Sequence, residues 1–143
     1  MSSEGWSFTA EIDGDDIVLN NVTATWFGGD NDPLDNGETA SGVMTKGNPD
    51  VMGCALPVVP THPSTAGSPL AFSPRIPWKT QVQVSTADKS VVVPLIDNGP
   101  AKSARDAIDL TVAAFKHFAP IEKGVINVSV RIIGAAKYVP KPV

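Results

Sequence analysis

Hydrophobic and polar residues alternate along several short segments of the chain, as they do in β-strands that bury one face. Alternation covers residues 6–12, 17–27, 80–86 and 124–133, and residues 90–96 form a predicted strand that is apolar after Ser90. In the last alternating segment, Ile126, Val128, Val130 and Ile132 share one face. The pattern predicts a mostly-β domain of roughly six to eight short strands with one helix, and a closed barrel is favoured because closure leaves no exposed strand edge.

The one segment with helical spacing lies between Ser103 and Phe118, and the pattern allows two starts for the helix. In the first, Ser103 caps the helix and Asp106 occupies the capping-box position. In the second, residues 107–110 form a short strand, and Thr111 caps a two-turn helix that ends at His117. The pattern alone leaves both starts open.

Two long segments are predicted to be loops. Residues 28–42 are dense in Gly, Asp and Asn. Residues 56–78 carry prolines at positions 57, 60, 63, 69, 74 and 77, which excludes a helix or a central strand. We expect an extended surface loop over this Pro-rich segment, suited to act as a lid.

Composition narrows the class of protein. The chain has 143 residues, 42% of them hydrophobic and 18% charged, which suits one folded domain and excludes a disordered chain. The net charge is -4 and no Lys/Arg cluster is present, so nucleic acid is not an expected partner. The single cysteine, Cys54, allows no intramolecular disulfide, and no apolar run is long enough to span a membrane.

The first 16 residues are polar and acidic and lack the basic start and apolar stretch of a secretory signal. From this pattern we expect a protein that is made and folded in the cytoplasm without a secretory leader.

The second half of the chain contains a recognisable order of motifs. A strand, the turn "DNGP" (97–100), the segment "AIDLTVAAF" (107–115) and a last alternating strand follow one another. This order resembles the rare lipoprotein A family of double-psi β-barrels, in which an Asp-x-Gly-Pro turn precedes an Ile-Asp-Leu-Ser segment and a short Ala-rich helix. The same barrel and the same two later aspartates are similar to the 3D domain of lytic transglycosylases.

The first half is similar to the same family. "ATWFGG" (24–29) and "ETASG" (38–42) resemble its opening motifs, and "IPWKTQVQV" (76–84) resembles its Leu-Pro-x-Gly-Thr-x-Val strand entry. The resemblance implies a double-psi β-barrel over residues 22–133, interrupted by the Pro-rich insertion at 56–78. Residues 1–21 would then be an N-terminal strand extension and 134–143 a tail of the same single domain. It also implies that the helix starts at Thr111.

The resemblance implies cleavage of peptidoglycan glycan strands without water. A carboxylic acid protonates the glycosidic oxygen, and its carboxylate then helps the muramoyl 6-hydroxyl to attack C1, which leaves a 1,6-anhydro end. Asp109 is the implied acid/base and Asp97 its partner. The implied substrate-binding residues are Glu38, Thr39, Ser41, Trp78 and Lys102. No metal and no other cofactor is expected.

The residues around Asp109 agree with such a role. Ile108 and Leu110 flank it, and burial among apolar groups raises a carboxyl's pKa, so that the acid stays protonated near neutral pH. An ionised Asp97 nearby would raise this pKa further, whereas a helix that starts at Thr111 would lower it. A purely structural role, in a turn for Asp97 and before a helix for Asp109, is the alternative.

Two positions depart from the family pattern. Val43 stands where the rare lipoprotein family has Glu after Thr-Ala-Ser-Gly, and Cys54 lies where these families carry His or Asp. Glu38 would have to replace the missing Glu. These departures favour an alternative function, a non-catalytic module that binds cell-wall glycan or another protein. A component of a phage or injection apparatus would reach the cell wall without a secretory leader.

Other candidate sites have simpler explanations. Asp30, Asp32, Asp35 and Glu38 lack the spacing of a calcium loop and suit a solvated acidic loop. Cys54 with His62 or His117 lacks an orienting third group, so a buried cysteine is favoured over a nucleophile. Trp26 and Phe27 suit the core, whereas Trp78, at the end of the Pro-rich segment, is the better candidate for stacking on a sugar. Lys102 and Arg105 would suit the carboxylates of peptide stems.

Overall fold

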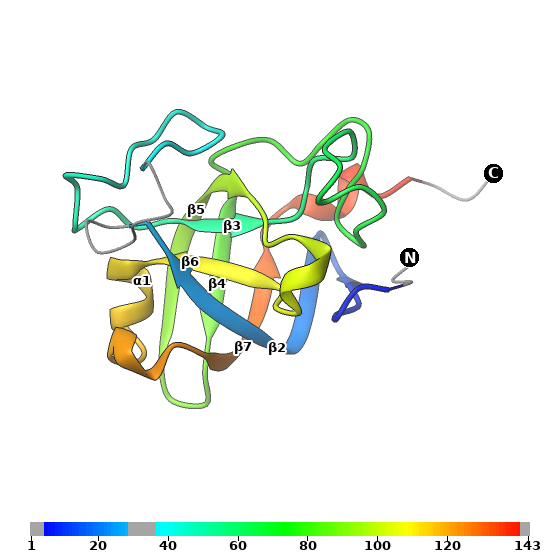
Figure 1. Ribbon diagram of the computed structural model, residues 1–143. Helices are drawn as coiled ribbons and strands as arrows, with labels where there is room; N and C mark the ends of the chain where they lie inside the picture. Colours follow the sequence, from blue (N-terminus) through cyan, green and yellow to red (C-terminus); the bar gives the residue numbers. More distant parts are fainter. Residues whose placement is uncertain (1–4, 29–36, 141–143) are drawn as a thin grey trace.

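The computed structural model describes residues 5–28 and 37–140, and its strands form a closed barrel (Figure 1). The strands are β1 (Glu11–Asp13), β2 (Asp16–Phe27), β3 (Cys54–Leu56), β4 (Gln81–Ser85), β5 (Ser90–Asn98), β6 (Ile108–Thr111) and β7 (Ile126–Ile132). Their order around the barrel is β2-β6-β3-β5-β4-β7, and pairing of β7 with β2 closes it. β1 extends the sheet as a hairpin partner of β2.

The barrel contains two parallel strand pairs, β2 with β6 and β3 with β5, and its other pairings are antiparallel. β3 lies between β5 and β6 and therefore links the two parallel pairs. The mostly-β fold and the double-psi β-barrel expected from the motifs are confirmed, as is the placement of β5 and β7 in one closed sheet.

A bulge in β2 decides which of its residues face the core. The pairing of β2 with β7 shifts register between Leu19 and Val22, next to Asn21, whose φ is 53°. A bulge adds one residue and so reverses the inward and outward alternation. Leu19 and Val22 are consequently both buried, as is Ala24, and Thr25 comes to lie on the outer face.

The strand expected over residues 6–12 forms only at Glu11–Asp13. Trp6 and Phe8 are buried without a partner strand, their rings edge-to-face with centroids 6.1 Å apart. Packing of the two rings on the core fixes this segment and accounts for its alternation. β2 already begins at Asp16, ahead of residue 22, where we expected the barrel to start.

The helix α1 (Val112–Lys116) starts where the resemblance implied. The Thr111 side chain caps it by accepting a hydrogen bond from the Ala114 N–H at 3.4 Å, and His117 ends it. Ser103 lies instead in the 3₁₀ turn η1 (Lys102–Ala104); the other two such turns of the described residues are η2 (Ile121–Lys123) and η3 (Ala135–Tyr138). None of the helices in the described parts has the length and apolar character to cross a membrane.

The Pro-rich segment is a loop without helix or strand beyond Leu56, as expected, but several of its side chains are buried in the core instead of lying on the surface. It is drawn in green in Figure 1, at the end of the barrel away from α1. Its apolar side chains Val58, Leu70, Phe72 and Ile76 are buried. The prolines prevent regular structure but not burial, because turns can place apolar side chains on the barrel. Such anchoring does not suit a movable lid.

Asn98 ties this segment to the end of β5. Its Oδ1 accepts hydrogen bonds from the Val58 and Val59 N–H groups at 3.0 and 3.1 Å, and its Nδ2 donates to the Thr65 hydroxyl at 3.0 Å. Asp97 and Asn98, the first two residues of the "DNGP" turn, therefore anchor different loops. Asn98 holds the Pro-rich segment, and Asp97 holds the turn that contains Ala40.

Candidate functional site

Four neighbouring strands place one residue each in a continuous row. Thr25 of β2 is the register partner of Asp109 of β6. Asp109 is also the partner of Ala55 of β3. Ala55, on its other side, is the partner of Asp97 of β5. Direct partners project from the same face of a sheet. Both predicted carboxyls therefore lie on one face of the sheet, with the buried Ala55 between them.

Asp109 stands on the solvent side of a strand whose other side is core. Its neighbours Ile108 and Leu110 are fully buried, whereas Asp109 is half-buried. Alternation along β6 therefore puts the carboxyl outside the barrel interior but against its wall. Part of the Asp109 surface thus stays exposed, while most of its surroundings are protein.

A second carboxyl, Asp106, joins Asp109 through one hydroxyl group. The Thr25 Oγ1 lies 2.8 Å from Oδ2 of Asp106 and 2.5 Å from Oδ1 of Asp109. A hydroxyl carries one proton and can donate only one of these two hydrogen bonds. Both hydrogen bonds form together when one carboxyl of the Asp106–Asp109 pair is protonated and donates to the Thr25 oxygen.

The electrostatics favour Asp109 as the carrier of this proton. Burial raises the pKa of Asp109 to about 8, helped by the hydrogen bond and negative charge of Asp106 and by the more distant charge of Asp97. The Thr25 hydroxyl opposes the shift by donating to the ionised form. Asp97 thus raises the pKa of Asp109, as expected, but burial and Asp106 raise it more. The Asp106 side chain itself is almost fully buried, at 5% exposure.

Asp97 organises the turn that contains Thr39 and Ser41. Its Oδ1 accepts hydrogen bonds from the N–H groups of Ala40 at 2.9 Å and of Asn98 at 2.8 Å. The Thr39 hydroxyl donates to the Val43 carbonyl at 2.6 Å and lies 3.0 Å from the Ser41 hydroxyl. Asp97 therefore has a structural role, because its carboxylate fixes the backbone of this turn.

The turn also explains where Glu38 and Val43 lie. Glu38 is exposed and pairs with Met44 in an isolated β-bridge, directly before the Asp97-bound turn. Val43 takes part through its backbone carbonyl, which any residue would provide. The Thr-Ala-Ser-Gly motif thus forms one rim next to Asp97.

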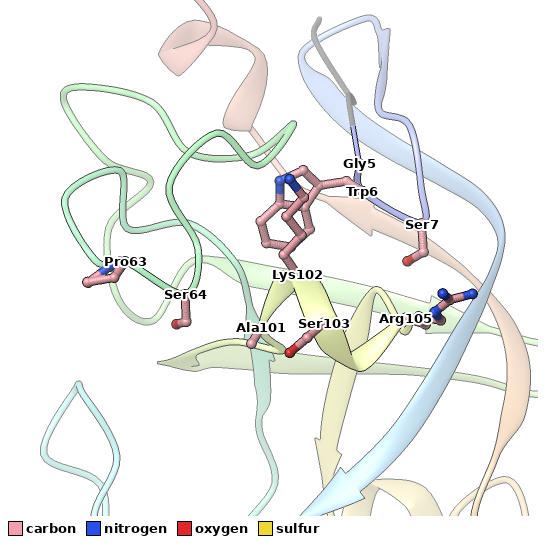
Figure 2. A pocket seen from close by; sticks show the side chains of 9 residues that line it. All are labelled: Gly5, Trp6, Ser7, Pro63, Ser64, Ala101, Lys102, Ser103 and Arg105. Carbon is pink, nitrogen blue, oxygen red and sulfur yellow. The ribbon is translucent and has the colours of Figure 1, made fainter.

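Trp78 and Lys102 occupy other surroundings. The Trp78 ring is half-buried on the core, and the Arg75 guanidinium covers one face of it at 4.1 Å from the ring centroid. Lys102 lines a hollow together with Trp6, and none of the three aspartates lines this hollow (Figure 2). Their roles in glycan binding stay predictions.

Cys54 is a core residue. It is fully buried, and its register partners are Leu95 and Leu110. Burial, and secondarily the charge of Asp109, raise the pKa of the thiol, so a thiolate nucleophile is disfavoured.

The two histidines make other contacts. His62 Nδ1 lies 2.7 Å from the Ser64 hydroxyl, and His117 Nε2 lies 3.1 Å from the Ser90 carbonyl. Residues 5–28 and 37–140 contain no group of side chains suited to hold a metal ion. Asp30, Asp32 and Asp35 of the acidic loop lie outside the described residues.

The sequence analysis missed Thr25 and the role of Asp106. Thr25 precedes Trp26 in the alternating segment and was the outward residue between two inward ones. For Asp106, the sequence pattern predicts only the capping-box position of a helix capped by Ser103. The sequence signal for the carboxyl pair is the spacing of Asp106 and Asp109, which lie three positions apart with the apolar residues 107 and 108 between them.

Comparison with known proteins agrees with this fold. A family model described as lytic transglycolase matches residues 20–130. Among solved structures, the Streptomyces papain inhibitor is similar, with a TM-score of 0.52 and 26% sequence identity over 78% of this chain and 90% of that chain. A search among curated proteins finds no significant match.

Proposed function

Because the chain belongs to the lytic transglycolase family of double-psi β-barrels, we propose that it cleaves peptidoglycan glycan strands with Asp109 as the general acid/base. The observation that carries this proposal is a reachable carboxyl with a pKa raised to about 8. An acid with a pKa near the working pH serves in both directions of proton transfer. Its site of action would be the bacterial cell wall.

The chemistry needs one proton donor that becomes a proton acceptor. Asp109 donates its proton to the glycosidic oxygen as the bond from this oxygen to C1 breaks. The resulting carboxylate accepts the proton of the muramoyl 6-hydroxyl while that oxygen bonds to C1. The proton count of Asp109 is restored and no water is consumed. Between the two steps, the Thr25 hydroxyl is within reach to donate to the Asp109 carboxylate.

Asp106 and Asp97 have different supporting roles in this proposal. Asp106 is a positioning residue that keeps Asp109 protonated through charge and hydrogen bonding. Asp97 holds the Thr39–Ser41 turn beside the row and adds negative charge, which favours a positively charged, oxocarbenium-like sugar.

Incubation of the protein with purified sacculi tests the proposal. We expect soluble fragments with 1,6-anhydro-muramic ends, detected by mass spectrometry. Because the protonated form of Asp109 is needed, the rate should fall as the pH rises past about 8. Fragments with ordinary reducing ends would indicate hydrolysis instead, and an absence of fragments from pH 5 to 8 would refute cleavage.

A second candidate is a non-catalytic barrel that binds a protein. The similarity to the Streptomyces papain inhibitor favours it, as do the departures at Val43 and Cys54. If the chain is an inhibitor of this kind, papain activity on a peptide substrate should fall as the protein is added, with an end point at a fixed molar ratio. Full papain activity at a large molar excess would exclude inhibition of this protease.

A further inference from the structure

An open hollow of about 1050 Å³ lies beside η1, between the N-terminal segment, the Pro-rich segment and residues 101–105 (Figure 2). We call it the N-terminal hollow; it is lined by Gly5, Trp6, Ser7, Pro63, Ser64, Ala101, Lys102, Ser103 and Arg105. Its size matches that of large ligand sites. Residues 5–7 precede the segment 20–130 that the family model matches, so the hollow combines the family barrel with an additional segment of this chain.

The charged residues lining the hollow are both basic. Lys102 and Arg105 are exposed. Among the described residues, none that lines the hollow is acidic, and the ion pairs involve neither Lys102 nor Arg105. The chain as a whole carries 15 acidic and 11 basic residues. Two exposed cations attract an anionic ligand, and the neighbouring Asp106 carboxyl is buried and bonded to Thr25 rather than to Arg105.

The arrangement of the two cations suits an extended anion better than a compact one. In Figure 2 the Lys102 side chain extends alongside Trp6, whereas Arg105 lies on the other side of the η1 turn, near Ser7. Arg105 has a left-handed backbone, with φ 62°, at the end of this turn. A single phosphate or sulfate needs donors that converge on one point, whereas separated cations match two separate carboxylates.

The hollow also has apolar and hydroxyl groups. Trp6, Pro63 and Ala101 provide apolar surface, and three serines provide hydroxyl groups. Gly5 leaves room for Lys102, because a methyl group at this position would meet the Lys102 Nζ at 2.5 Å. A ligand with short apolar groups between two carboxylates fits these walls.

The hollow is close in sequence to the carboxyl pair. Arg105 lines the hollow and the next residue, Asp106, bonds to Thr25. The end of the η1 turn thus separates the hollow from the carboxyl pair by a single residue step.

We propose that the N-terminal hollow binds a short acidic peptide through two of its carboxylates, held by Lys102 and Arg105. That this peptide is the stem of a peptidoglycan strand rests on the proposed function; the peptide site itself does not.

Calorimetric titration of the whole chain at low ionic strength tests the site. The probe is a synthetic tripeptide with two free carboxylates, and its fully amidated form and inorganic phosphate are the comparison ligands. We expect the acidic tripeptide to bind, the amidated form to bind at least about 10-fold more weakly, and added salt to weaken binding. Equal binding of the amidated peptide, tighter binding of phosphate, or no binding of the acidic tripeptide would each overturn the proposal.

Three single variants locate the site. Lys102→Met keeps the apolar stem that packs near Gly5, and Arg105→Asn keeps a residue that tolerates a left-handed backbone. Each should weaken tripeptide binding by about 10-fold or more. Lys89→Met, in the exposed loop between β4 and β5, removes the same charge elsewhere and should leave binding unchanged. Equal losses in all three variants would show a general charge effect and refute the site.

Assays on glycan strands stripped of their peptides separate the two proposals. The Arg105→Asn variant should release anhydro products from stripped strands as the wild type does, because Arg105 is assigned to the peptide and not to the glycan. Absence of these products in the wild type, with tripeptide binding intact, would defeat the proposed function alone. Loss of tripeptide binding with normal cleavage of stripped strands would defeat the peptide site alone.

Discussion

Asp109→Asn is expected to lower the release of anhydro products from sacculi by about 100-fold or more, the usual contribution of a general acid. The asparagine side chain has the size of aspartate but cannot supply a proton at neutral pH. Its oxygen can accept from Thr25 and its NH₂ can donate to Asp106. The loss of activity should therefore occur in a folded protein with intact glycan binding.

Asp88→Asn is the matched control for this experiment. Asp88 lies in the exposed loop between β4 and β5, where it accepts a hydrogen bond from the Thr86 hydroxyl at 3.2 Å. The same chemical change there should leave product release at the wild-type rate. Undiminished turnover in Asp109→Asn would defeat both the role of this residue and the mechanism based on it.

The barrel could be predicted from the sequence because its motifs are local. Alternation predicts β7, β4 and the inward face of β2, and the family resemblance of the turn and the following Ile-Asp-Leu segment implies the helix start at Thr111 and the candidate residues Asp97 and Asp109. Each feature depends on residues that are close together in the chain. Long-range pairing then follows from the family topology.

The carboxyl pair could not be predicted in this way, because it depends on the register of β2 with β6. The contacts from Thr25 to Asp106 and Asp109 join residues 81 and 84 positions apart. They also require the bulge after Leu19, which turns Thr25 outward. A one-residue change in either register would point the hydroxyl into the core.

Burial was the property that sequence patterns predicted least well. Prolines correctly excluded helix and strand over residues 57–77, yet Leu70 and Ile76 are fully buried. Alternation around Trp6 and Phe8 has the period of a strand, but there it reflects two rings packed on the barrel. In both places tertiary packing, which no local pattern encodes, decides the outcome.

Asp109, the proposed catalytic acid, should make the fold less stable as the pH rises. Between the ordinary carboxyl pKa of 3.8 and about 8, the folded state keeps the Asp109 proton, whereas the unfolded chain has lost it. Because the folded state then binds more protons, the free energy of unfolding falls with rising pH. One proton corresponds to at most about 1.4 kcal/mol per pH unit.

Asp16 does not obscure this effect. The Gly134 N–H and then Arg131 lower the pKa of Asp16 below 3.8. Its stabilising contribution is therefore complete above pH 3.8 and is lost only as the pH falls below that value. Measurements from pH 5 to 8 lie outside the range in which Asp16 titrates.

Urea unfolding of the wild type and of Asp109→Asn at several pH values from 5 to 8 measures this contribution. The variant lacks the titrating group, so its free energy of unfolding should exceed that of the wild type by an amount that grows with pH. The effects of titrating groups that do not interact with Asp109 cancel in the difference between the two proteins, whereas the interactions of Asp106 and Asp97 with Asp109 are part of the measured contribution. Parallel pH profiles for the two proteins would show that Asp109 ionises normally in the fold, and its assignment as an acid that is protonated near neutral pH would then be wrong.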